Sequence, residues 1–210
     1  GQQVAVDEIG PSGLTVTRKI LTPRAGYFSR YLETFENKTT APITVSVRIK
    51  TNHRNASSNP RVVDTSDGDQ ILSVIDPVLR DRWAVIDDQT DADRFEFGGG
   101  QSIPETGHLF DGAGAGTQVA SADYSLIGTT GNLTYQWDNI TVAAGAKASF
   151  MHFVFNQLDR QSAREAALRL AQLPPEAIDD LTTDERAQIR NFVVPAASAL
   201  PPLPNLDAGL

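Results

Sequence analysis

The chain contains no cysteine, which excludes a disulfide framework, a thiolate metal site and a thiol nucleophile. It is also poor in positive charge, because 18 Lys and Arg residues stand against 26 Asp and Glu residues, a net charge of −8 at pH 7. A surface of that sign repels phosphate backbones and anionic lipids, so we expect no nucleic-acid partner. No apolar run is long enough for a membrane helix, and we expect no membrane insertion.

What the chain does have is enough apolar material to fold, since 40 % of its 210 residues are hydrophobic and only 21 % are charged. This length suits one domain, with or without an appendage. Residues 1–4 show neither the basic start nor the apolar centre of a signal peptide, which indicates an already trimmed N-terminus.

Strand patterns dominate the first three quarters of the sequence. Residues 43–50 alternate strictly between apolar and polar side chains, which predicts a strand with one buried face. The aromatic and β-branched run 27–36, followed by an Asn-, Thr- and Pro-containing turn, predicts the first strand of an antiparallel hairpin. Further strands are predicted at residues 14–21, 70–75, 83–86, 132–142 and 147–155. Because no βαβ alternation is visible, the prediction is a mainly β fold, an antiparallel β-sandwich.

Helical signals follow the strands. Ser162 and Glu165 form a capping-box pattern that predicts a helix over residues 162–172, and Thr182 with Glu185 predicts a second short helix. The sandwich would therefore cover residues 1–158, with a C-terminal helical segment at 159–194 packed on it.

Residues 195–210 hold four prolines and have no periodic apolar face, which predicts a Pro-rich linker. A linker at this position implies neighbouring domains of a longer chain as partners.

Acidic residues concentrate in residues 64–96, where ten acidic side chains stand against three arginines. Within this region Asp87, Gln89, Asp91 and Asp93 place oxygen ligands at alternate positions, the spacing with which a curled loop surrounds calcium. The glycine and the bidentate glutamate of a helix-loop-helix calcium site are missing, so a solvated acidic loop is the alternative. A second, weaker candidate of the same kind lies at residues 64–69.

Three large aromatic residues are candidates for ligand binding. Trp83 lies beside the acidic region, and Tyr135 and Trp137 share one face of a predicted strand, so their rings could stack on sugars if they are exposed. The alternative is that they fill the core of the sandwich, as large aromatic residues at alternate strand positions usually do.

Ionisable groups give weaker signals. His53, His108 and His152 are too far apart in sequence for a local zinc motif, and we expect surface or hydrogen-bonded core roles for them. Glu105 and Asp111 are the carboxylates considered for general acid-base roles. Nucleophile-elbow, phosphate-loop and HExxH motifs are absent from the sequence.

The run from Tyr31 to Val47 resembles the strand, Asn-Thr-Pro turn and alternating strand of Ig-like or supersandwich β-modules in large bacterial surface and secreted proteins. The segment from Leu173 to Phe192 is similar to a closing helical segment of such modules, and galactose-mutarotase-like supersandwiches are a related resemblance. These resemblances imply a fold and an extracellular or cell-surface setting. They imply no catalytic residues, because no His/Glu pair maps onto a mutarotase site.

The function expected first is a non-catalytic extracellular β-sandwich module, structural, adhesive or partner-binding, rigidified by calcium at the acidic loop. On this hypothesis the chain is not an enzyme. The second hypothesis is a carbohydrate-binding domain that uses the rings of Trp83, Tyr135 and Trp137. The third is a sugar-active enzyme that uses two carboxylates.

Overall fold

The structure is a computed structural model that describes residues 2–9, 13–24, 26–54, 59–88 and 104–203. The strands are β1 Gln2–Ile9, β2 Leu14–Thr22, β3 Phe28–Asn37, β4 Ile43–Arg54, β5 Arg61–Thr65, β6 Trp83–Asp87, β7 Glu105–Leu109, β8 Ser121–Ile127, β9 Thr130–Val142 and β10 Lys147–Gln157. The helices are α1 Arg160–Leu170, α2 Pro175–Ile178 and α3 Thr183–Gln188. No helix in the described part of the chain has the length and apolar character needed to cross a membrane.

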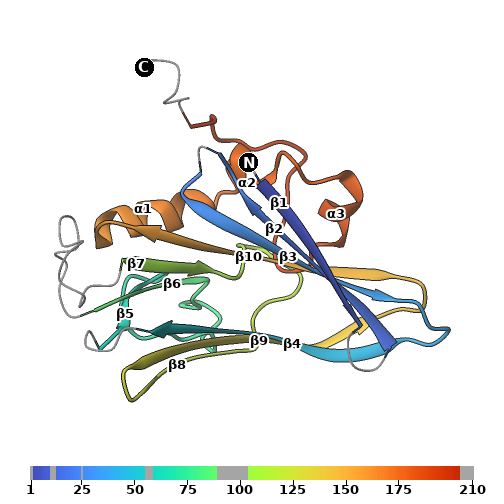
Figure 1. Cartoon of the computed structure of the whole chain (residues 1–210), viewed down its shortest axis with the longest axis horizontal. Coiled ribbons are helices and arrows are strands. Elements are labelled where there is room, and N and C mark those ends of the chain that lie inside the picture. Colours follow the sequence, from blue (N-terminus) through green and yellow to red (C-terminus); the bar gives the residue numbers. More distant parts are fainter. Residues whose placement is uncertain (1, 10–12, 25, 55–58, 89–103, 204–210) are drawn as a thin grey trace.

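Two antiparallel sheets face each other (Figure 1). The large sheet has seven strands in the order β1-β2-β3-β10-β7-β6-β5, and the small sheet has three in the order β4-β9-β8. Helix α1 covers the face of the large sheet that points away from the small sheet; we call this the outer face and the opposite one the inner face. The predicted class, a mainly β antiparallel sandwich with short C-terminal helices, is confirmed.

Alternation along the strands builds two separate cores. On β10, Phe150 points inward and packs with Tyr135 and Trp137 of the small sheet, whereas Met151 and Phe153 point outward and pack under the helices. Because successive side chains of a strand point to opposite faces, one apolar strand can serve both cores. This explains why the central part of β10, residues 150–155, is apolar at every position except His152.

Helix α1 buries a face of small residues against the large sheet. Ala163, Ala167 and Leu170 recur at helical spacing and are fully buried. The helix begins two residues earlier than predicted, because Asp159 and not Ser162 is the N-cap, and its carboxylate accepts the Ser162 backbone N–H. The second predicted capping box, formed by Thr182 and Glu185, is confirmed at α3.

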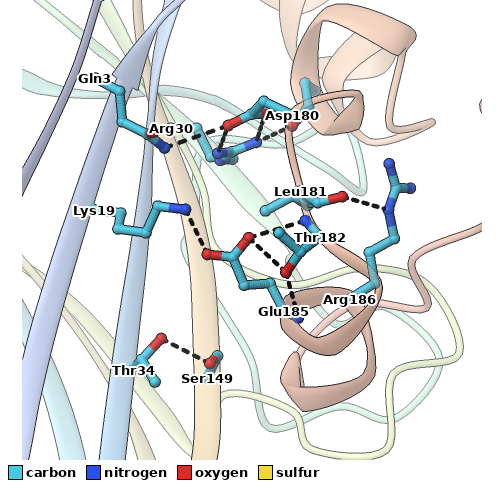
Figure 2. Close-up of polar contacts among 11 residues, drawn as sticks. Gln3, Lys19, Arg30, Thr34, Ser149, Asp180, Leu181, Thr182, Glu185 and Arg186 are labelled. Atoms are coloured by element: carbon cyan, nitrogen blue, oxygen red, sulfur yellow. Dashed lines mark hydrogen bonds and ion pairs between the residues drawn. The ribbon is translucent and has the colours of Figure 1, made fainter.

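The segment that carries α2 and α3 is fastened to the outer face by charged contacts (Figure 2). The fully buried guanidinium of Arg30 donates to both carboxylate oxygens of Asp180, at 2.6 and 2.7 Å, and to the carbonyl of Ala177. Lys19 pairs with Glu185 nearby. A bidentate pair of this geometry fixes orientation as well as distance, so the C-terminal segment has a defined position over β2 and β3.

Not every predicted strand forms. Residues 70–75 are bend and irregular chain, with Ile71 and Ile75 exposed, and backbone N–H groups of this loop donate to the carboxylates of Asp69 and Asp81. Such local side-chain bonds satisfy the backbone without a ladder, which is why an apolar run here is a loop. Strands β1, β5, β7 and β8 and helix α2 were not predicted.

The small sheet leaves part of the inner face uncovered. Val4 and Val6 on β1 are 57 % and 46 % exposed, whereas Phe150 on β10 is fully buried beneath the small sheet. The register places Val6 beside Arg18 and Arg18 beside Glu33, so these residues share the inner face. The strip formed by the inner side chains of β1, β2 and β3 is therefore open along the edge strand β4.

Candidate functional site

A groove of about 300 Å³ runs along this open strip. Its floor is made by alternate residues of β2 and β3, among them Val16, Arg18, Glu33 and Phe35, and its side by five consecutive residues of β4, Val45 to Ile49. Consecutive residues line a groove when a strand presents its edge and not its face. In the described part of the chain β4 pairs with β9 alone, so the groove has the unpaired main-chain edge of β4 along one side.

An irregularity in the small sheet lies next to this edge. The β4–β9 register shifts between Val45 and Val47, and Asn139 of β9 has a φ of 56°. A β-bulge bends the strand that carries it and strengthens the local twist, and asparagine tolerates the left-handed conformation. Two residues of β9, Asp138 and Asn139, stand opposite Ser46 of β4, so the bulge bends β9 where it pairs with the part of β4 that borders the groove.

One carboxylate lies at the centre of the groove floor. Glu33 faces Arg18 directly across the β2–β3 pair, and Glu33 Oε1 accepts a hydrogen bond from Arg18 Nε at 2.7 Å. The Glu33 side chain is only 4 % exposed, while the Arg18 side chain is 49 % exposed. Within the described residues, Glu33 Oε2 takes part in no hydrogen bond and is not among the fully buried atoms. This second oxygen is available to a ligand.

Behind the carboxylate lies a buried imidazole. His152 Nε2 is 3.4 Å from Glu33 Oε1, and His152 Nδ1 is 2.9 Å from the Tyr135 hydroxyl. Burial lowers the pKa of His152 and raises the pKa of Tyr135 well above its ordinary value, so at pH 7 the imidazole is neutral and the phenol keeps its proton. Because a carboxylate only accepts, we assign the imidazole proton to Nε2, with Tyr135 donating to Nδ1.

Tyr31 completes this arrangement at the open side. It is the cross-strand neighbour of His152, and the two rings are stacked with centroids 4.8 Å apart. Tyr31 is half-buried, so part of its ring remains accessible on the inner face. The result is a line of contacts from the accessible Arg18 through Glu33 and His152 to Tyr135 of the small sheet.

The other two histidines lie deeper between the sheets. The rings of His53 on β4 and His108 on β7 are 5.1 Å apart, and both side chains are buried. Burial lowers the pKa of His53 to about 4 and holds that of His108 well below its ordinary value. His53 Nε2 and both ring nitrogens of His108 have no hydrogen-bond partner within the described residues, and these histidines are neutral core residues.

The three aromatic residues predicted to bind a ligand are all inside the protein. Trp83 is 2 % exposed, and Tyr135 and Trp137 are fully buried. They therefore offer no face to a sugar and belong to the two cores. The half-buried rings on the inner face are instead those of Tyr31 and Phe35.

Glu105 and Asp111, considered for acid-base roles, do not form a pair. Glu105 begins β7 and Asp111 lies two residues beyond its end; the strand alone, from Glu105 to Leu109, spans roughly 13 Å at the usual rise, more than the distance between the two carboxylates of glycosidases. Asp111 accepts hydrogen bonds from Trp137 Nε1 and the Val119 backbone, and burial raises the pKa of its carboxyl to about 7. Its observed role is to connect the 110–120 loop to the core.

The predicted calcium loop falls mostly outside the described residues, since Gln89, Asp91 and Asp93 all do. The remaining ligand, Asp87, is buried and pairs with Arg160 at 2.6 Å. In the described ranges, no group of three or more His, Asp or Glu residues is arranged to hold a metal ion. Calcium binding at this loop stays a prediction.

Sequence reasoning missed Arg18 and Glu33. They are 15 residues apart and come together only through the β2–β3 register, and Glu33 meets His152 across 119 residues. The one available signal was a charged residue at an inward position of each strand. An inward charge in an otherwise apolar face is costly unless it is paired, and this points to a partner or a ligand.

Comparisons with known proteins give little further guidance. Neither a protein-family model nor a curated protein sequence matches this chain. One matching solved structure is described as a putative aldose 1-epimerase from Klebsiella pneumoniae subsp. pneumoniae, with 9 % identity, a TM-score of 0.49, and coverage of 81 % of this chain and 53 % of the other. This chain thus spans about half the length of that structure, and what the two share is a β-sandwich.

The prediction of a non-catalytic module is wrong, and so is the prediction that the chain is no enzyme, whereas the extracellular or cell-surface location stays a prediction. Within the protein itself, ionisable groups converge on a groove, which a purely mechanical module does not require. The carbohydrate-binding domain and the sugar-active enzyme remain as hypotheses.

Proposed function

We propose that the chain acts on sugars in the groove between β2, β3 and β4, with Glu33 as the general base. One observation carries the proposal: Glu33 lines the groove with its Oε1 held by Arg18 and His152, while Oε2 has no hydrogen-bond partner among the described residues. A base must be fixed in position and still have an oxygen for the incoming proton. The proposal rests on this geometry and not on the similarity to the solved structure.

Each neighbour of Glu33 has a separate task in this scheme. Arg18 is half exposed, lies in the groove and offers further N–H groups to a ligand hydroxyl or to developing negative charge. His152 is buried and does not reach the groove, so it is a positioning residue that donates to Glu33 from Nε2. Tyr135 fixes the tautomer of His152 in turn.

The walls of the groove favour a sugar as the ligand. Phe35, Val16 and Val47 supply apolar surface for the C–H faces of a sugar ring, and the carboxylate, the guanidinium and the open edge of β4 supply partners for its hydroxyl groups. A volume of about 300 Å³ lies at the lower end of the range for small-molecule sites. Among the described lining residues Glu33 is the single carboxylate, which fits proton transfer and not hydrolysis by two carboxylates.

Anomer interconversion tests the base: when the C1 hydroxyl loses its proton to the base, the C1–O5 bond breaks and O5 takes up a proton from solvent, and the ring recloses on the other face by the reverse transfers. Freshly dissolved α-glucose and α-galactose are followed by polarimetry with the protein, and we expect equilibration faster than in buffer. Glu33→Gln should lower this acceleration by about 10²-fold or more, the usual contribution of a general base. Glu36→Gln is the matched control, since Glu36 lies on the outer face of the same strand and pairs with Lys38 and Lys147.

Binding is measured separately by ligand-observed NMR. Equal acceleration by the wild type and Glu33→Gln would refute the base. Sugar binding without any acceleration would leave the groove as a carbohydrate-binding site, the second retained function. No binding and no acceleration would contradict the proposal as a whole.

A further inference from the structure

We infer that the groove belongs to a longer cleft built for a chain of several sugar units, so that oligosaccharides bind it more tightly than the monosaccharides that test the base. This inference rests on the proposed function, since it concerns the same site. It comes from the way three hollows on the inner face follow one another along β2 and β3.

The first two hollows share their residues. A second hollow of about 240 Å³ is lined by Val6, Val16, Arg18, Ile20 and Glu33, and three of these also line the groove. Arg18 and Glu33 thus belong to both, and the base lies at the junction of two hollows, not at the closed end of one. A ligand that occupies both must extend to either side of Glu33.

A third hollow, of about 460 Å³, continues the row. It lies at the end of the strands, where the inner-face residues Thr22, Ser29, Tyr31, Val154 and Asn156 line it together with Gly26, Tyr27, Phe28 and Phe155. Thr22 follows Ile20 by two positions on β2, and Tyr31 precedes Glu33 by two positions on β3, so both lie next in line on the same face. The Thr22 and Ser29 hydroxyls are 3.1 Å apart across the strand pair and give this end of the row a polar character.

The length of the row can be compared with that of a glycan. From Leu14 to Thr22 the face of β2 extends for roughly 26 Å at the usual rise per residue. A pyranose unit with its bridging oxygen spans about four bonds, or roughly 5 Å along the chain. The row therefore has room for about five units, several times what a single sugar needs.

Aromatic residues are placed as such a cleft requires. On β3 the inner-face sequence is Tyr31, Glu33, Phe35, so one half-buried ring lies on each side of the base, two residues away. Rings at this spacing can each support one sugar unit, while the carboxylate faces the unit between them. A site for one sugar would need one ring at most.

Binding as a function of chain length tests the inference. The probes are gluco-, manno-, galacto- and xylo-oligosaccharides of one to six units, measured by calorimetry on the whole chain. In the series that binds, affinity should rise with each unit up to four or five and then stay constant. A monosaccharide that binds as tightly as the tetrasaccharide of its series would overturn the inference, whereas a failure of all sugars would contradict the proposed function instead.

Variants identify the subsites. Tyr31→Ala and Phe35→Ala should each weaken tetrasaccharide binding by up to about tenfold while monosaccharide affinity changes less than twofold. Tyr31→Phe keeps the ring and should keep the length dependence. Lys50→Ala is the control, because Lys50 lies on β4 outside the lining and should change neither value. An unchanged length dependence in both alanine variants would refute the aromatic subsites, and the series on the unmodified chain remains decisive if a variant does not fold.

Discussion

Asn191 should be among the most important single side chains for stability. It is fully buried, its Oδ1 accepts the Met151 backbone N–H at 2.9 Å, and its Nδ2 donates to the carbonyls of Phe110 and Met151 at 2.6 and 2.7 Å. It thereby connects the C-terminal segment, β10 and the end of β7. The perturbation is Asn191→Ala, which removes all three bonds without adding bulk.

The magnitude follows from what the substitution leaves behind. One buried N–H and two buried carbonyls lose a partner, and each such group costs about 1–3 kcal/mol, so a total near 4 kcal/mol is expected. In a chain of 210 residues, 1 kcal/mol lowers Tm by roughly 2–4 °C, which gives a decrease of about 10 °C. Since domains are stable by only about 5–15 kcal/mol, this is a large fraction of the total.

The assay is thermal and urea unfolding monitored by circular dichroism and tryptophan fluorescence. The matched control is Asn156→Ala, because Asn156 is an exposed asparagine on β10 and should change stability by less than about 0.5 kcal/mol. A decrease in Tm below 2 °C for Asn191→Ala, or an equal decrease in both variants, would refute the reasoning from buried partners.

Three further predictions concern pH, packing and calcium. Asp111 has a folded pKa of about 7 against roughly 3.9 unfolded, so its contribution to the free energy of unfolding falls as pH rises from about 4 to about 7. In urea titrations at several pH values, Asp111→Asn should flatten that fall. His53 has the opposite trend, because its folded pKa of about 4 costs stability as pH falls below about 6.5, and the difference between the wild-type and variant profiles removes this contribution. Gly107→Ala should destabilise by about 3 kcal/mol or more, because a Cβ would lie 2.0 Å from the Phe155 ring; an unchanged Tm would show that the ring moves aside cheaply. Millimolar calcium should raise Tm if the acidic loop binds it, and Asp91→Asn should remove the shift, whereas no shift in the wild type would dispose of the calcium site.

The fold was more predictable than the site, for a physical reason. The strict alternation at 43–50 is a local signal, because one buried face requires period two whatever lies opposite, and β4 forms there. Residues 70–75 carry apolar side chains too, but bonds from Asp69 and Asp81 to the backbone replace a ladder, and this depends on loop geometry. Strand β7 has five residues and follows a glycine-rich stretch of sequence, so its alternation of side chains is too short to predict a strand.

Glu33 lies beyond sequence reasoning of this kind. Its charge is plain in the sequence, but its role depends on three partners from β2, β10 and β9 that are brought together by strand order and register. Trp83 and Trp137 were predicted to bind a ligand because their rings are large. Large rings are also the ones that contribute most to a core, and both residues are buried. Tyr31 and Phe35 are accessible because β4 is the edge strand of the small sheet. The position of a sheet edge depends on tertiary structure, so a local sequence pattern does not predict it.

The last part of the chain completes the large sheet. Ile189 bridges in parallel to Ser149, and the backbone of 190–191 bonds to Ser149, Gly112 and Thr117, so this segment occupies the position beside β10 that β7 is too short to fill. During synthesis on the ribosome, β10 emerges some forty residues before the segment that closes its edge. The nascent protein must therefore pass through a stage with an unsealed strand, and a version truncated ahead of residue 189 would stay at that stage and be prone to self-association.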